Sequence, residues 1–164
     1  MNIILPSMGR CGSEALFHAI QLALPDYQHN FYRSLNKVTW KDHTIVKTHD
    51  VAPKELPDNN KVIYTYGNVH LIASSVMKKD YEWKQLHFYH FHTKFISCEE
   101  SLINSDGLGL RKNYRSWKQF CNVLFIHYDN LFESSELISN YLGVEVVLPE
   151  RERRLTNRIT VNEW

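Results

Sequence analysis

Four short runs of apolar residues alternate along the chain with segments whose apolar positions recur at helical spacing. The runs are rich in Ile, Val, Leu, Phe and Tyr, and they cover residues 2–5, 44–47, 62–66 and 123–128. Three of them are almost continuously apolar, which is typical of strands buried on both faces of a sheet. We therefore predict a β-strand at each of these four places.

The predicted helices lie between and after these runs. Leu16, Ile20 and Leu24 stand four residues apart, as they would on one face of a helix. Similar stripes complete the set of predicted helices, at residues 13–24, 69–79, 81–102 and 135–142. Because parallel strands need a crossover connection, this alternation predicts an α/β fold in one domain spanning residues 1–164. The sheet is expected to be mostly parallel, with helices on both faces, as a three-layer αβα sandwich.

The composition limits the classes of partner. Nineteen Lys and Arg oppose eighteen Asp and Glu, so the net charge of +1 gives no reason to expect nucleic-acid binding. No apolar run approaches the roughly 20 residues of a membrane-spanning helix. Cys11, Cys98 and Cys121 show no C-x-x-C spacing, so reduced thiols are expected. Together these features predict a cytoplasmic protein without a membrane span.

The first predicted strand is followed by a glycine-containing loop and a helix. Ligands bind at the carboxyl ends of parallel strands, so this loop is a candidate binding site. Gly9 and Gly12 let the backbone turn its amides inward, the helix N-terminus adds unpaired amides, and Arg10 adds a full positive charge. The loop therefore indicates an anion cradle, although an ordinary strand–helix turn with Ser13 as N-cap stays open. No Gly is followed by Lys, and no G-x-G-x-x-G occurs, so neither a triphosphate site nor a dinucleotide site is predicted.

The second predicted strand ends in the letters VKTHD. Lys47 and His49 stand two residues apart and are therefore expected on the same face of the strand. Histidine suits a general base near neutral pH, and lysine can neutralise charge on a leaving oxygen. A catalytic role and a purely structural one are both open for this pair on spacing alone.

Most of the chain resembles one family. Four segments resemble, in the same order, the cytosolic-type sulfotransferases that use 3′-phosphoadenosine 5′-phosphosulfate (PAPS). These segments are PSMGRCGSEAL, IVKTHD, KVIYTYGNVHLIASSVMKKD and NVLFIHYDNLFESSELISNYLGVEV. The final TVNEW resembles a late segment of that family. The resemblance implies a P-loop NTPase-like sulfotransferase fold, PAPS as donor, adenosine 3′,5′-bisphosphate (PAP) as product, and no metal. It implies a small-molecule, lipid or carbohydrate acceptor and leaves a homo-oligomer open.

The resemblance also assigns roles to residues. His49 matches the catalytic base, and Lys47 matches a lysine that contacts the phosphosulfate. The match to the 5′-phosphosulfate loop covers Gly9, Arg10, Cys11, Gly12, Ser13 and Glu14.

The 3′-phosphate and adenine sites are matched by residues further along the chain. Ser75 matches a serine of the 3′-phosphate site, and Arg158 matches its late cation. Tyr114 lies in YRSW, which resembles a segment near the adenine.

The sequence departs from the family at three of these positions. Gly67 stands where the family has an arginine that binds the 3′-phosphate, Glu14 where it has a threonine, and Ala15 where many members have a stacking tryptophan. Either an arginine of residues 151–158 compensates for Gly67, or the donor site is weakened. Because the loops are short and the chain stops at residue 164, the acceptor pocket is expected to be small, open or completed by a partner chain.

The sequence also bears on four other functions. A sulfotransferase-like module that binds PAP or a protein partner without catalysis is the main alternative, and Gly67 favours it. A nucleoside-phosphate kinase is disfavoured by the missing Gly-Lys pair. A metal site in HFYHFH is disfavoured because His87, His90 and His92 do not share one helix face. A thiol phosphatase would need an arginine six residues after Cys11, which is absent.

Overall fold

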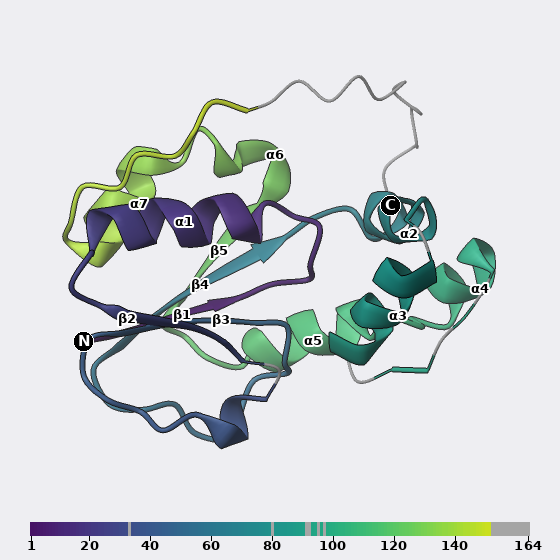
Figure 1. The fold of residues 1–164 in the computed structure, drawn as a ribbon, viewed down its shortest axis with the longest axis horizontal. Helices are drawn as coiled ribbons and strands as arrows, with labels where there is room; N and C mark the ends of the chain where they lie inside the picture. Colours follow the sequence, from purple (N-terminus) through teal and green to yellow (C-terminus); the bar gives the residue numbers. More distant parts are fainter. Residues whose placement is uncertain (33, 80, 91–92, 95, 97, 152–164) are drawn as a thin grey trace.

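Five parallel strands of the described chain form one sheet, with helices on both faces (Figure 1). The computed structural model describes residues 1–32, 34–79, 81–90, 93–94, 96 and 98–151, apart from the side chains of residues 83, 87 and 99. The strands lie side by side in the order β2 (Gln28–Tyr32), β3 (Thr44–Thr48), β1 (Asn2–Pro6), β4 (Asn60–Tyr66) and β5 (Val123–His127). Every pairing between these neighbours is parallel. The predicted α/β fold with a parallel sheet is confirmed.

The four predicted strands are present, with ends that differ by at most two residues from the apolar runs. The sequence pattern missed β2, whose letters QHNFY mix polar and aromatic residues. This strand lies at the edge of the sheet and pairs only with β3 among the described strands. Most of its residues are exposed, so no apolar run is required there.

One face of the sheet is covered by α1 (Ser13–Ala23), α6 (Tyr128–Leu131) and α7 (Ser135–Leu142). Ile3 and Leu5 of β1 point into this layer and pack in a common core with the buried residues of the three helices. α1 and α7 begin and end almost where the apolar stripes predicted them, because each stripe faces the sheet. The short helix α6 was not predicted, and it begins at residue 128, which was expected to end a strand.

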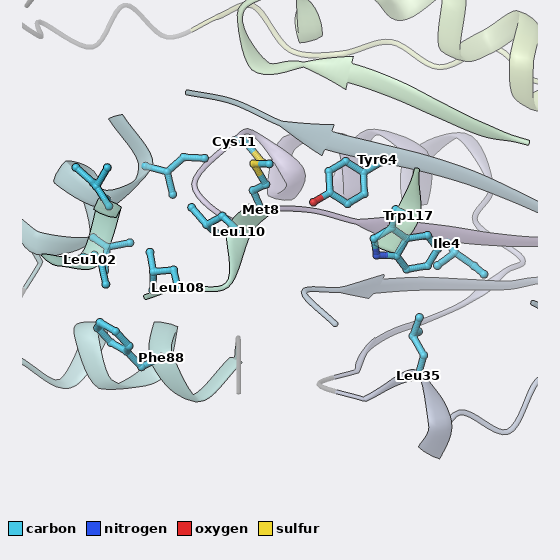
Figure 2. Packing of buried hydrophobic residues seen from close by; sticks show 14 of the residues in the cluster. Ile4, Met8, Cys11, Leu35, Tyr64, Phe88, Leu102, Leu108, Leu110 and Trp117 are labelled. Atoms are coloured by element: carbon cyan, nitrogen blue, oxygen red, sulfur yellow. The ribbon is translucent and has the colours of Figure 1, made fainter. Parts of the chain in front are cut away.

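The core on the opposite face is built with the remaining elements: the 3-10 helix η1 (Leu35–Lys37), α2 (Val69–Met77), α3 (Tyr81–His90), α4 (Glu99–Asn104) and α5 (Leu110–Trp117). In Figure 1, α2, α3 and α4 gather beyond the ends of the strands, whereas η1 and α5 lie on the side of the sheet away from α1. Figure 2 shows the core of this layer, where Ile4 of β1 and Tyr64 of β4 lie among side chains of these elements. Ile4 alternates with its neighbours Ile3 and Leu5, as expected along a strand. The three-layer αβα arrangement is therefore confirmed.

The prediction of one helix over residues 81–102 is wrong. α3 ends at His90, and α4 begins only at Glu99. The amide of Thr93 donates to the carbonyl oxygen of Phe88 at 3.0 Å, and the Thr93 hydroxyl donates to the same oxygen at 3.4 Å. These two hydrogen bonds join Thr93 to the last turns of α3, and the described residues 93 and 94 are not helical, so the aromatic spacing does not continue as one helix.

A buried polar network joins α5 to the ends of β3 and β4. The Asn113 side chain donates from Nδ2 to the carbonyl oxygens of His49 and Asp50, both at 2.8 Å, and its Oδ1 accepts from the Tyr64 hydroxyl at 2.6 Å. The Trp117 indole donates to the Asp50 carbonyl at 3.0 Å. Asn113, Tyr64 and Trp117 are buried, so these bonds form away from water and hold the segment that follows β3.

We predict that Asn113→Ala destabilises the protein. The change leaves the Tyr64 hydroxyl and the His49 carbonyl without this partner in a buried site, which should lower the free energy of unfolding by about 2–4 kcal/mol. Urea denaturation measures the difference. Asn104→Ala, at an exposed position of α4, is the matched control. Equal effects of the two substitutions would contradict a stabilising role for the network.

Candidate functional site

The loop after β1 lies at a point where the sheet's connections diverge. From β1 the chain crosses to β2 at one edge of the sheet, whereas from β4, which lies on the other side of β1, it leads to β5 at the opposite edge. The Ser7 amide donates to the carbonyl oxygen of Thr48 at 3.1 Å, and the Met8 amide donates to that of Thr65 at 3.2 Å. The loop is thus fixed at the carboxyl ends of β3 and β4, the place where ligands bind in open parallel sheets.

The backbone of this loop turns through left-handed conformations. Gly9, Arg10 and Gly12 have φ angles of 71°, 52° and 75°. A Cβ atom at Gly12 would collide with Leu131 and press against the Tyr128 ring, so only glycine fits there. Arg10 adopts a conformation that non-glycine residues rarely adopt, so the loop is locally strained.

The N-terminus of α1 is uncapped by side chains within the described part of the chain. Gly12 is the N-cap residue, and Ser13 is the first helical residue, so the alternative with Ser13 as N-cap is wrong. The amides of the first turn, at Ser13, Glu14 and Ala15, lack partners within the helix. They point to the loop side, where a helix N-terminus favours negative charge.

A cavity of about 640 Å³ opens between the loop, the end of β3 and α3. It brings together seven of the residues predicted from the sequence: Gly9, Arg10, Gly12, Ser13, Glu14, Lys47 and His49. Its lining therefore combines the loop that joins β1 to α1 (residues 7–12), called the anion loop below because it is the predicted anion cradle, with the two functional candidates at the end of β3. Lys47 and His49 line the same cavity, as their spacing of two predicted.

Lys47 is held in a narrow, largely apolar position. The residue is 9% exposed, and its Nζ lies 5.9 Å from the ring centroids of both Phe17 and Phe31. Burial lowers the pKa of Lys47 to about 8. The ammonium forms an ion pair with the Glu14 carboxylate, whose negative charge acts in the opposite direction and favours the charged lysine.

Glu14 connects two basic side chains at the mouth of the cavity. Besides Lys47, it lies 3.2 Å from Nε2 of His18, one turn further along α1. The ion pair with Lys47 and the nearby helix N-terminus offset its charge, so the carboxylate is tolerated beside the anion loop. An anion that enters the loop must therefore compete with Glu14 for the Lys47 ammonium.

His49 follows β3 and is surrounded by groups from three other elements. Its Nδ1 lies 2.9 Å from the Ser7 hydroxyl and 3.1 Å from the Ser7 carbonyl oxygen. Its ring centroid lies 5.7 Å from that of Phe31 on β2 and 6.0 Å from that of His90 on α3. The imidazole therefore has a fixed position on the cavity wall.

Arg10 and Ser75 are brought together by the fold. Nε of Arg10 donates to the hydroxyl of Ser75 on α2 at 3.1 Å. The two residues were predicted for opposite ends of the donor, the 5′-phosphosulfate and the 3′-phosphate. Their contact places the Arg10 guanidinium between the loop and α2.

Cys11 faces the core below the loop. Its thiol donates to the carbonyl oxygen and hydroxyl of Thr65 at 3.2 and 3.4 Å, and burial raises its pKa to about 11. Figure 2 shows Cys11 and Met8 among the buried side chains of the core. Cys11 thus anchors the loop as a neutral thiol, and only its main chain is placed to contribute to an anion site.

Three other predicted residues lie outside this cavity or outside the described residues. A Cβ at Gly67 would meet Tyr128, Cys11 and Ile72 at 3.6–3.8 Å. Tyr114 packs against Tyr64, Tyr66 and Phe125 on the opposite face of the sheet. Arg158 lies outside the described residues, as do residues 153 and 154.

Arg151 is the described member of the arginine group that could compensate for Gly67. Its Nη2 binds the Asp129 carboxylate at 3.1 Å, and its guanidinium lies 5.0 Å from the centroid of the Tyr128 ring. Tyr128 lines the cavity and also borders Gly67. Arg151 is therefore placed behind a cavity residue and not in the lining.

Sequence reasoning missed most of the apolar wall of the cavity. Phe31, Leu86, Tyr128 and Phe132 line it, together with Phe17. Phe17 could have been found, because it lies three residues after Glu14 on the same face of α1. Phe31 stands on the missed strand, and Leu86 belongs to a helix that faces the cavity only through the tertiary packing.

The described residues contain no group of three or more His, Cys, Asp or Glu side chains arranged to hold a metal ion. The side chains of His87 and His92 lie outside the described part of the chain. Within that part, no helix combines the length and the apolar character needed to cross a bilayer.

Comparison with known proteins gives matches in structure. No protein-family profile matches the sequence, and no curated protein matches it significantly. The structure is similar to retinol dehydratase in complex with androsterone and the inactive cofactor PAP, with a TM-score of 0.60 and 16% sequence identity over 88% of this chain and 60% of that chain. It is also similar to retinol dehydratase in complex with retinol and PAP, with a TM-score of 0.55 and 14% identity over 87% of this chain and 59% of that chain.

These matches concern the fold. The chain spans about 60% of the length of retinol dehydratase, and the aligned part has the same arrangement of sheet and helices. The identity is too low to transfer individual residues or activities. The α/β architecture expected from the resemblance to sulfotransferases is thus the architecture that this chain shares with a protein crystallised with PAP.

Proposed function

We propose that this chain is a sulfotransferase that uses PAPS as donor and a small apolar molecule with a hydroxyl or amine group as acceptor. One observation carries the proposal: the anion loop of β1 and the Lys47–His49 pair of β3 line a single cavity. The fold shared with retinol dehydratase, whose structures contain PAP, supports the same donor.

The residues at the loop fit an anionic group. The unpaired first-turn amides of α1, the Arg10 guanidinium and the Lys47 ammonium all lie around the loop end of the cavity. Glu14 opposes such a group, and Gly67 supplies no charge of its own. Glu150 also lines the cavity, but two cations and a helix N-terminus gather at the loop itself, and this local concentration of positive charge favours an anion there.

The chain's own groups divide the proposed chemistry between them. The loop amides and Arg10 would bind the anionic oxygens and hold the reacting sulfur in line. The Lys47 ammonium would offset the charge that develops on the leaving phosphate oxygen. Nε2 of His49 would accept the acceptor's proton, since Nδ1 lies against Ser7.

The bound donor would supply the sulfuryl group, and the bond from sulfur to the 5′-phosphate oxygen would break as a bond to the acceptor forms. The aromatic wall would exclude water from this step.

The apolar wall favours an apolar acceptor over a carbohydrate. Phe17, Phe31, Leu86 and Phe132 line the cavity together with the loop. A sugar buried there would leave several hydroxyl groups without hydrogen-bond partners, which costs free energy. A phenol or a lipid alcohol would bury its ring or chain against these side chains and present one hydroxyl to His49.

A non-catalytic module that binds PAP is the second candidate. The Glu14–Lys47 ion pair favours it, because the cation that the reaction requires is already paired. Radiolabelled PAPS, incubated with a panel of phenols, lipid alcohols, amines and sugars, would separate the two candidates. Transfer supports the enzyme, whereas PAP binding in a thermal-shift assay without transfer to any acceptor supports the module.

We predict that His49→Asn lowers the rate of sulfuryl transfer by about 10²- to 10⁴-fold, the usual contribution of a general base. The Kd for PAP should stay within twofold to threefold of the unaltered protein, roughly the spread expected for a residue that does not contact the phosphates. His43→Asn, at an exposed position outside the cavity, is the control and should keep normal rates. Near-normal transfer by the His49 variant would remove its assignment as base.

The lowered pKa of Lys47 predicts a pH dependence of donor binding. Below its pKa of about 8 the lysine carries its positive charge, and above that pH the charge is lost. The affinity for PAP should therefore be constant near pH 7 and fall as the pH rises above about 8. Calorimetric titration with PAP measures this affinity, at pH values kept above about 6, the second pKa of a phosphate group, so that the charge of the ligand stays constant.

The control for this prediction is Lys47→Arg. Arginine stays charged throughout this range, so the variant should bind PAP with an affinity that does not fall above pH 8. The same fall in both proteins would show that another group causes it.

Glu14→Gln is predicted to tighten PAP binding by about threefold to tenfold. The substitution removes a partly exposed charge worth up to about 1 kcal/mol and releases Lys47 for the ligand. Glu136→Gln, in the first turn of α7, removes the same charge from another helix N-terminus and should leave the Kd unchanged. Weaker binding by the Glu14 variant would instead mean that this carboxylate orders the site.

A further inference from the structure

Ser7 makes a set of contacts that the proposed reaction does not use. It is fully buried directly after β1, where the strand passes into the loop. Its hydroxyl lies 2.9 Å from Nδ1 of His49, and its own carbonyl oxygen lies 3.1 Å from the same nitrogen. The amide of Gly9 donates to the Ser7 hydroxyl oxygen at 3.3 Å. One buried serine therefore contacts both the anion loop and the imidazole.

The two oxygens of Ser7 together favour one tautomer of His49. A carbonyl oxygen can only accept a hydrogen bond, so its contact with Nδ1 is a hydrogen bond only in the tautomer that carries the proton on Nδ1. In the neutral imidazole the lone pair then lies on Nε2. The hydroxyl accepts from the Gly9 amide and lies within reach of the same Nδ1–H, so it adds a second acceptor on this side of the ring.

Phe31, His90 and Asn113 contact His49 through its ring and its main chain. Phe31 and His90 approach the ring through their aromatic faces and edges, at centroid separations of 5.7 and 6.0 Å. Asn113 binds the main-chain carbonyl of His49 and fixes its backbone. Ser7 is the described residue that binds Nδ1 through both of its oxygens.

We propose that Ser7 is a positioning residue that holds His49 as the Nδ1–H tautomer and links the orientation of its ring to the anion loop. The role of Nε2 as a base rests on the proposed function. The tautomer of His49 does not, because it can be measured in a protein that has no activity. Loss of the hydroxyl should free the ring to rotate and to populate the other tautomer. The base would then be presented to the acceptor in only a fraction of the molecules.

The first test reads the tautomer directly. Nitrogen NMR of protein labelled at histidine, at a pH where His49 is neutral, should show a protonated Nδ1 and an unprotonated Nε2, with His49→Asn used to assign its signals. A protonated Nε2 in the unaltered protein would overturn the inference. This measurement needs neither donor nor acceptor, so it stands even if the chain transfers no sulfuryl group.

The second test removes the hydroxyl. In Ser7→Ala, the His49 signals should shift toward a mixture of tautomers, and kcat should fall on the order of tenfold to a hundredfold while the Kd for PAP stays unchanged. Ser134→Ala removes another buried serine hydroxyl, which bonds to the Asn130 carbonyl at 2.7 Å, and should change neither quantity. His49 signals in Ser7→Ala that match the unaltered protein would overturn the proposal.

Ser7→Cys covers the case in which Ser7→Ala does not fold. Cysteine nearly keeps the volume of the buried side chain but accepts hydrogen bonds weakly. The same shift of the His49 signals is expected in this variant, and unchanged signals count against Ser7. If the unaltered protein shows the expected tautomer but transfers no sulfuryl group, the proposed function is contradicted and the inference about Ser7 is not.

Discussion

The pairing of β1 between β3 and β4 is the constraint on which the candidate site depends. The backbone hydrogen bonds from Ser7 to Thr48 and from Met8 to Thr65 continue this pairing past the end of β1. These bonds place the start of the anion loop beside His49, the residue that follows β3, so the pairing of the strands alone brings the imidazole to the loop. Since the buried side chains of Met8 and Cys11 tie the loop down from below, its amides keep a fixed direction.

Charge balance is the second feature that shapes the site. Lys47 is buried deeply enough for its pKa to be lowered, yet the Glu14 carboxylate stabilises its charged form. A lysine buried without such a partner would tend to lose its proton and with it the ability to neutralise an anion. Glu14 is the ion-pair partner of the lysine when no ligand is bound, and it would compete with a bound anion. In the proposed donor site this competition would make the carboxylate a determinant of affinity, and not only a departure from a family pattern.

The sequence predicted the features that depend on local apolar patterns. Val62 and its neighbours formed a continuous apolar run because both faces of β4 are buried, whereas the exposed edge strand at Gln28–Tyr32 required no such pattern. Gly9 and Gly12 marked the loop because only glycine avoids strain or collision at such positions. Contacts between distant segments could not be read in the same way. Nothing in the local pattern around Asn113 shows that it binds the main chain after β3, sixty-four residues away in sequence.

The roles of Lys47 and His49 follow from their surroundings more than from their residue types. At neutral pH a lysine with a pKa near 8, paired with a carboxylate, remains mostly protonated and acts as a cation. It cannot also remove a proton from an acceptor, because it has no lone pair in that state. His49 has its Nδ1 against Ser7, and the proposed Nδ1–H tautomer puts the lone pair on the opposite nitrogen of the ring. In the proposed reaction the two side chains would therefore have separate roles, the lysine at the leaving oxygen and the histidine at the acceptor.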